Sequence, residues 1–532
     1  MTAAGRLARL LDALVLLVLA LALLVAANGD VGPLARVEDV FLIALALTFI
    51  RHWFHPYAVT LAAPRRAVGW GIAAYGVLFS FITVTRHWAF RTHALDLGYY
   101  VQILWSLTQD LRGPYMSLPE MHVWGDHFSP TLYLLVPLFA LFPGPVVLLI
   151  AQSAALGLGA IPVFALARRR LGCEPAAAGF ALLYLLSPML HGANIRDFRI
   201  AAFAIPLLLA AVYCFETGRT GWFIAAVILT LGCREDAALA VIGLGLWIAL
   251  VRRRWMWGLA LAAGSLGLLF FDIKFLMPSF RGEPYPHLWR YAHLGGSLGE
   301  IILTMLLHPL KTLGVMVSGE KVSYVFTFLA HLGFLPLLAP WELIPALPGL
   351  AQNLLSRDPV LFSYRTQYTS FVLPFFVLAA ISGYGRLAPQ LSLRGRPVRG
   401  LALGLAFLAS LALTARTLND LAVKQWWPGE RQRGAYVVLA SVPPGASVSA
   451  WDRFVAHVAT RPKVFVFPVG IEQSEYVLLD ATTVPGRDPA LGLDRRGKEV
   501  TLRVPGRDGP AQYQYEVVRE AEGYLLLRRS RS

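Results

Sequence analysis

The chain has 532 residues, of which 57% are hydrophobic and 15% are charged, and its mean hydropathy is +0.58. Soluble domains contain about 45–50% apolar and about 25% charged residues, so this composition excludes an ordinary soluble globular protein. The apolar residues form blocks long enough for bilayer-spanning helices, which need about 20 residues each. In lipid such blocks must be helical, because every backbone polar group needs an internal partner. The sequence therefore predicts an α-helical, polytopic membrane protein.

The formal net charge of +15 does not indicate nucleic-acid binding. Arginines cluster at 168–170, 252–254 and 394–399, and each cluster flanks an apolar run. This pattern is typical of cytoplasmic loops that set the orientation of a membrane protein. The three cysteines have no disulfide or metal-site spacing and are expected to be packing residues.

In chain order, apolar runs at 11–27, 37–50 and 68–84 predict the first three spans, with the N-terminus in the cytoplasm. The basic loop at 51–66 then lies inside. The polar and aromatic stretch 87–130 consequently lies outside, beyond the end of the third span.

Later apolar runs predict further spans up to residue 418. The run 131–142 and the proline-containing run 341–355 are interpreted as interfacial or re-entrant, which leaves about 13 spans and an external C-terminus. These further spans are expected at 146–167, 175–190, 201–215, 222–231, 237–251, 256–271, 301–317, 322–338, 371–385 and 401–415.

The composition changes after about residue 419, where short β-type runs replace long apolar runs. Residues 419–532 are expected to form a small soluble α/β domain outside the membrane, beyond a transmembrane domain at 1–418. This domain has no Gly-rich phosphate loop and no nucleophile motif, so an accessory or acceptor-binding role is expected. Strands are expected at 434–439, 447–449, 464–467, 476–479, 500–504 and 513–518, with a short helix at 452–460.

The stretch 87–130 is expected to carry the active site, and Asp96 is its most informative residue because it follows soon after the third span. A carboxylate at the membrane surface can act as general base on an acceptor hydroxyl. The alternative is a solvated loop whose acids are merely exposed. Two other polar segments that contain acids, 191–199 and 234–236, interrupt later apolar runs and also lie outside under this topology.

Arginines in these breaks are suited to bind phosphate through two hydrogen bonds each. Together with Asp96 they favour glycosyl transfer from a lipid-linked phosphosugar, in which cations stabilise the departing phosphate. The arginines considered are Arg196, Arg199, Arg234 and Arg357.

A divalent metal, Mg²⁺ or Mn²⁺, would neutralise the same phosphate. Asp126-His127 and Glu235-Asp236 are the candidate pairs, and Asp126, His127 and Glu235 form the expected ligand set. No spacing here is a metal signature, so exposed or hydrogen-bonded roles for the loop histidines remain open.

Several motifs resemble those of a bacterial membrane protein family known as domain-of-unknown-function family 2079. That family is similar in layout to the GT-C glycosyltransferases, including protein O-mannosyltransferases and lipid A aminoarabinose transferases. The resemblance implies a polyprenyl-phosphate sugar donor and a catalytic acid early in the first outer loop, a position that Asp96 matches. The motifs are Asp96-Leu97-Gly98, Gly125-Asp126-His127-Phe128-Ser129-Pro130, Cys233-Arg234-Glu235-Asp236-Ala237, Gln367-Tyr368 and Ser447-Val448-Ser449-Ala450.

One position departs from the family pattern. There the pair equivalent to Asp197-Phe198 is usually followed by His, Pro and Glu, whereas Arg199-Ile200-Ala201 follows here. The departure weakens the expectation of a metal site and favours inactivity or altered substrate choice.

The leading hypothesis is a GT-C-like glycosyltransferase of the bacterial inner membrane. It would move a sugar from a polyprenyl-phosphate donor to an extracytoplasmic protein, lipid or polysaccharide, with Asp96 as base. Alternatives are a transporter or flippase for a lipid-linked or small polar solute, and a non-catalytic envelope scaffold. The expected substrate-binding residues are His93, Tyr99, Gln102, Asp126, His127, Asp197, Arg196, Arg234, Glu235, Asp236 and Tyr368.

Overall fold

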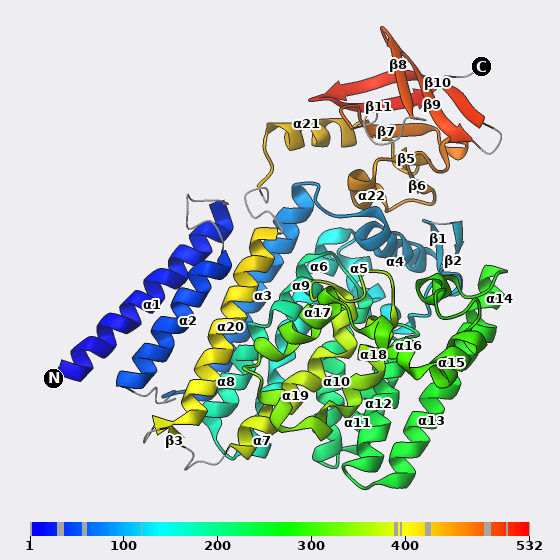
Figure 1. The fold of residues 1–532 in the computed structure, drawn as a ribbon. Coiled ribbons are helices and arrows are strands. Elements are labelled where there is room, and N and C mark those ends of the chain that lie inside the picture. The colour runs from blue at the N-terminus through cyan, green and yellow to red at the C-terminus, as the bar shows by residue number, and fades with distance from the viewer. Residues whose placement is uncertain are drawn as a thin grey trace.

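The computed structural model describes residues 3–28, 37–55, 61–118, 120–387, 392–393, 396–420, 427–483, 491–506 and 509–530. A bundle of helices carries a C-terminal mixed β-sheet at one end (Figure 1). The helices are α1 (Ala3–Asn28), α2 (Val37–Phe54), α3 (Pro64–Trp88), α4 (Tyr99–Gln109), α5 (Val136–Leu141), α6 (Pro145–Leu158), α7 (Ala160–Leu171), α8 (Glu174–Leu185), α9 (Pro188–Ile195), α10 (Ala204–Glu216) and α11 (Thr220–Leu231). They continue with α12 (Ala237–Leu250), α13 (Trp255–Phe271), α14 (Met277–Arg281), α15 (Leu298–Leu307), α16 (Pro309–Met316), α17 (Gly319–Ala330), α18 (Leu347–Leu355), α19 (Leu373–Arg386), α20 (Val398–Asp420), α21 (Glu430–Leu439) and α22 (Asp452–Val458).

Four helical stretches in the described part of the chain are long and apolar enough to cross a membrane: Pro64–Trp88, Pro145–Leu171, Glu174–Ile195 and Trp255–Arg281. A fifth would be the pair α15 and α16, if the two helices form one span. The described residues also contain shorter apolar helical stretches of 10–17 residues. The helical, multi-spanning architecture is therefore confirmed, whereas the number of about 13 spans stays a prediction.

Two expected spans are not straight helices. The run 301–317 is bent by 104° between α15 and α16, because Pro309 lacks an N–H and cannot continue the preceding helix. The run 322–338 is interrupted after α17, where Gly333 and Phe334 have positive φ angles of 60° and 56°. The run 131–142 is a short pair of helices ending at Leu141, as expected.

Arginines gather at one end of the bundle, away from the C-terminal sheet (Figure 1). Helix α7 ends in Arg168, Arg169 and Arg170, and Gly172 ends the helix in the left-handed conformation with a φ of 64°. Arg65, at the start of α3, pairs with Glu174 at the start of α8. Of the third arginine cluster, Arg394 lies outside the described residues.

The C-terminal sheet has seven strands in the order β6-β5-β7-β11-β10-β9-β8. Strand β5 is parallel to both β6 and β7, and the remaining pairs are antiparallel. One expected strand, 434–439, is wrong, because these residues form the second half of helix α21. The strands are β5 (Val448–Ala450), β6 (Val464–Val466), β7 (Tyr476–Asp480), β8 (Gly492–Arg496), β9 (Glu499–Gly506), β10 (Gly509–Ala521) and β11 (Tyr524–Arg529).

The central strand β7 is buried along its whole length because both faces of the sheet are covered. Alternate residues of a strand point to opposite faces. Val477 and Leu479 pack into the sheet's own core, whereas Tyr476 and Leu478 join a cluster that includes Phe90 and other residues of the polar stretch. The sheet is thus packed directly against the segment that carries Asp96.

Polar contacts fix this docking. The ring of His93 lies 2.8 Å from the Asp452 carboxylate, and the Ala94 N–H donates to the same carboxylate at 2.9 Å. Gln102 is buried, donates to Ser117 Oγ at 2.7 Å and accepts from the Ser117 N–H at 2.9 Å. Gln102 also donates to the Pro462 carbonyl oxygen at 3.3 Å. His93 and Gln102, both expected to bind substrate, therefore lie at the contact between the helical bundle and the C-terminal region.

We expect this docking to weaken in acid. Burial alone would raise the pKa of Asp452, but the hydrogen bonds from His93 and Ala94 outweigh it, so the pKa lies below its usual 3.8. A depressed pKa stabilises the docked state above the usual value, and this contribution is lost as pH falls through the folded value. The protection factors of the α22 amides, which are corrected for the intrinsic exchange rate at each pH, should therefore decrease when the pH is below about 4.

The variant Asp452→Asn should show fast exchange in α22 already at neutral pH. Asp494→Asn, on the exposed strand β8, is the matched control and should exchange like the wild type. Equal α22 exchange in wild type and Asp452→Asn at every pH would contradict the role of Asp452 in docking the sheet.

Candidate functional site

Asp96 lies on a single π-helical turn, Ala94–Gly98, between the end of α3 and the start of α4. The turn packs closely against α22. A Cβ atom added at Gly98 would lie 3.0 Å from the Val455 side chain, so the close approach needs glycine here. The Asp96 carboxylate forms an ion pair with Arg199, and the two side chains keep 16% and 23% of their surface exposed. Asp96 is therefore held in place and still reachable.

Arg199 is the residue that departs from the family pattern, and the fold places it against Asp96. Its backbone N–H donates to Gln152 Oε1 at 2.7 Å. Burial lowers the pKa of Arg199 to about 10, and nearby Arg234 and Arg290 also lower it. Because this pKa is still well above 7, the side chain stays charged at neutral pH. The expected base and an arginine that is expected to bind phosphate thus belong to one site.

Two further arginines converge on Tyr368. The guanidinium of Arg234 lies 4.8 Å from the centre of the Tyr368 ring, and that of Arg290 lies 5.5 Å from it. Arg234 also pairs with Asp236 through two contacts of 2.5 and 2.6 Å, and Arg290 pairs with Asp358 at 3.2 Å. These carboxylates hold the guanidiniums in fixed positions beside the aromatic ring.

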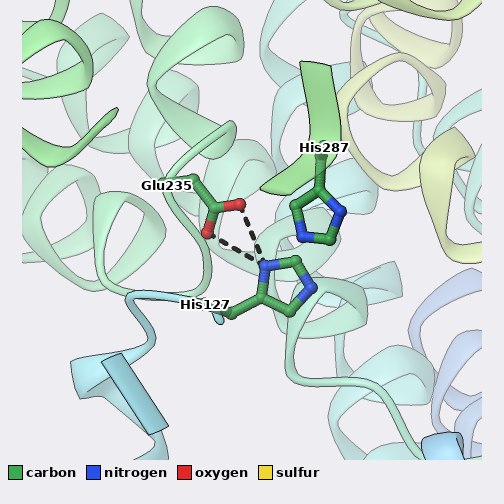
Figure 2. A group of neighbouring side chains, drawn as sticks. All are labelled: His127, Glu235 and His287. Atoms are coloured by element: carbon green, nitrogen blue, oxygen red, sulfur yellow. Dashed lines mark hydrogen bonds and ion pairs between the residues drawn. The ribbon is translucent and has the colours of Figure 1, made fainter. Parts of the chain in front are cut away.

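A second cluster lies next to these arginines. His127 Nδ1 lies 2.9 Å from Glu235 Oε1, and the ring of His287 stacks on that of His127 with centroids 4.8 Å apart (Figure 2). Possible ligand atoms of the three side chains all lie within 4.8 Å of one another. Tyr285 donates to Glu235 at 3.2 Å. The three segments come from distant parts of the chain.

The carboxylates of this cluster would attract a divalent metal. Burial would lower the pKa of His127, but Glu235 and Asp126 outweigh it and raise the pKa, so a bound metal would have to displace a proton from this ring. Burial, followed by the effect of His127, lowers the pKa of His287 to about 4, so this ring is neutral at physiological pH. Its Nε2 atom is buried and has no hydrogen-bond partner in the described structure. A neutral imidazole with an unused nitrogen is a ready metal ligand.

The expected ligand set is changed by the fold. His127 and Glu235 do come together, but His287 rather than Asp126 is the third member among the described residues. Asp126 instead lies beside the buried Tyr99 hydroxyl, whose pKa is raised by burial and then by Asp126. Two imidazoles and one carboxylate are typical of Zn²⁺ sites, whereas Mg²⁺ prefers oxygen ligands throughout.

Two expected site residues lie apart from these clusters. The Asp197 side chain is fully buried, pairs with Arg86 at 2.6 Å and accepts from the His93 N–H at 3.2 Å. Arg196 is exposed and lines a different cavity, beside Tyr364. The fold thus separates Asp197 and Arg196 from the arginines around Tyr368.

The residues that sequence reasoning missed are His287, Arg290 and Tyr285. All three lie in the loop between α14 and α15, which follows the expected span 256–271 and lies on the outer side under the predicted topology. Its position on the same side as Asp96 was the available signal, and it did not distinguish His287 from other loop residues.

We expect His287→Ala to lose Zn²⁺. Removal of one ligand from a three-ligand centre should weaken Zn²⁺ binding by about tenfold or more. Metal analysis of purified protein and competition with a chromogenic chelator measure this directly. His308→Ala is the matched control, because His308 is exposed at the start of α16. Equal Zn²⁺ content in the two variants would contradict the site.

Comparisons with known proteins match a family model and several solved structures. The family described as "Predicted membrane protein (DUF2079)" matches residues 86–526. No curated protein matches the chain. Among solved structures, ArnT from Cupriavidus metallidurans bound to undecaprenyl phosphate is 14% identical, with a TM-score of 0.49 over 89% of this chain and 99% of that chain. Its apo state is also 14% identical, with a TM-score of 0.47 over 87% and 98%.

Proposed function

The chain belongs to the DUF2079 family of predicted membrane proteins, and we propose that it is an integral membrane glycosyltransferase. It moves a sugar from a polyprenyl-phosphate donor to an extracytoplasmic acceptor. The observation that carries the proposal is the ion pair between Asp96 and Arg199, set beside Arg234 and Arg290. A general base and three phosphate-binding cations at the end of a membrane helix are the groups that this reaction needs.

The reaction follows from these positions. The acceptor hydroxyl attacks the anomeric carbon of the sugar, and Asp96 accepts its proton. The bond between that carbon and the phosphate oxygen breaks, which leaves the lipid phosphate with one more negative charge. Arg199, Arg234 and Arg290 stabilise this charge where it develops, because fixed cations in a poorly solvated site need no reorganisation.

Arg199 also links donor binding to catalysis. In the free protein its guanidinium forms an ion pair with the Asp96 carboxylate. A donor phosphate provides a second anion for the guanidinium, so donor binding draws Arg199 from Asp96 and frees the base. A Zn²⁺ ion held by His127, Glu235 and His287 would add positive charge near the leaving phosphate.

The arginine-rich end of the bundle is proposed to lie in the cytoplasm, which directs the candidate site outward. Helix α3 supports this orientation, because it starts at Arg65 among the arginines and ends next to the polar stretch. The proposal keeps about 13 spans in residues 1–418, a cytoplasmic N-terminus, and an outer soluble domain at 419–532.

The test is sugar transfer by purified protein from a panel of radiolabelled polyprenyl-phosphate sugars. Label reaching an acceptor or water would support the proposal. Donor binding without transfer would favour the transporter alternative. Neither binding nor transfer would favour the envelope scaffold, for which replacement of residues 419–532 by an unrelated domain would abolish function.

A further inference from the structure

A cavity of about 480 Å³ lies among α7, α10, α11, α12 and α13, at the arginine-rich end of the bundle. It is at the opposite end from the C-terminal sheet and from Asp96. The two arginine clusters 168–170 and 252–254, far apart in the sequence, meet at this cavity. Its charged lining residues are Arg169, Glu216, Arg252 and Arg254.

The cavity has more positive charge than its carboxylates neutralise. Arg170 and Arg252 share two carboxylates, because they pair with Glu216 at 2.6 and 2.5 Å and with Glu342 at 3.3 and 3.6 Å. Arg169 and Arg254 also line the cavity, and neither makes a side-chain ion pair with a described residue. The Nε atom of Arg252 is buried without a hydrogen-bond partner in the same described part of the chain. Guanidinium groups thus remain available for an anion.

The N-termini of two helices also favour an anion in this cavity. Helix α11 begins at Thr220, which lines the cavity, and α13 begins at Trp255, next to Arg254. The first backbone N–H groups of a helix have no partner within the helix, and the helix dipole places partial positive charge there. A phosphate oxygen is the kind of group that such a site accepts.

Exposed apolar side chains around the cavity indicate that the anion belongs to a lipid. Trp222 is 72% exposed, Met256 86% and Trp257 59%, and Trp257 also lines the cavity. Exposed tryptophans beside a basic loop are typical of the interface between lipid and water. The cavity thus combines cations for a phosphate with apolar surface for acyl chains, which favours a lipid over a free anion.

We propose that this cavity binds the headgroup phosphate of an anionic glycerophospholipid through Arg169, Arg252 and Arg254. The inference is independent of the proposed glycosyl transfer, because it uses none of the residues around Asp96. Bound lipid would fasten the turn after α7 to the turn between α12 and α13.

The experiment compares full-length wild type with the double variant Arg169→Gln/Arg254→Gln. Neither substitution removes an ion pair among the described residues, so the variant should fold. The matched control is Arg66→Gln/Arg253→Gln, which removes the same charge without changing the cavity lining. Thermal unfolding and native mass spectrometry are measured after addition of phosphatidylglycerol, phosphatidylcholine or inorganic phosphate.

Phosphatidylglycerol should raise the unfolding temperature of wild type and control, and the Arg169→Gln/Arg254→Gln variant should bind it at least about tenfold more weakly. Equal effects of phosphatidylcholine and phosphatidylglycerol would overturn the proposal. Stabilisation by inorganic phosphate to the same extent would also overturn it, in favour of a free-anion site. Equal phosphatidylglycerol affinity in both double variants would show that charge, rather than the cavity, attracts the lipid.

Discussion

Replacement of Asp96 by asparagine is expected to lower the rate of sugar transfer by about 10²–10⁴-fold. The amide has nearly the shape of the carboxylate, but it cannot accept the proton of the acceptor hydroxyl. The side chains of Arg199 and Asp96 are only 23% and 16% exposed, so loss of their ion pair should also cost some stability. The measurement is single-turnover transfer from the donor that the wild type uses, at equal amounts of folded protein.

Two variants separate loss of the base from loss of the ion pair. Arg199→Gln also removes the pair, but it keeps the base and should retain more activity than Asp96→Asn. Asp110→Asn removes an exposed carboxylate from the same stretch and should leave transfer unchanged. An Asp96→Asn protein with the wild-type rate would remove Asp96 from the mechanism.

Replacement of Asp197 by asparagine is expected to destabilise the protein by about 3–5 kcal/mol. The Asp197 side chain is fully buried against Arg86, which is itself 9% exposed, so the substitution leaves a buried cation without its counterion. Asp197 also has a φ of 129°, a conformation that few residues adopt and that the surrounding contacts must maintain. Equilibrium unfolding in detergent micelles measures the change.

The control is Glu516→Gln, which breaks the exposed pair with Arg528 and should cost less than about 1 kcal/mol. The double variant Arg86→Met/Asp197→Asn should recover much of the lost stability, because it removes the unpaired charge. Asp197 was expected to bind substrate. Normal stability of Asp197→Asn together with lost donor binding would restore that role and contradict the structural one.

Local features of the chain allowed the general architecture to be predicted. Apolar runs such as 146–167 and 256–271 are long enough that only a helix satisfies their backbone in lipid. The continuous apolar run 476–479 forms strand β7, because both faces of this strand are buried and each needs its own apolar row. For the run 434–439, the same local preferences did not decide between strand and helix. Its packing against β10 and β11 as α21 depends on residues about 80 positions away.

The candidate site was also predictable only in part from local sequence. The sequence by itself determined that Asp96, His127 and Glu235 lie in polar breaks between apolar runs, because residue types and hydropathy are local properties. Only the tertiary structure decided that His287 completes the His127–Glu235 cluster and that Arg199 pairs with Asp96. It also buried Asp197 against Arg86. Such contacts join positions about 50 residues or more apart, and helix packing rather than sequence spacing sets the distances between them.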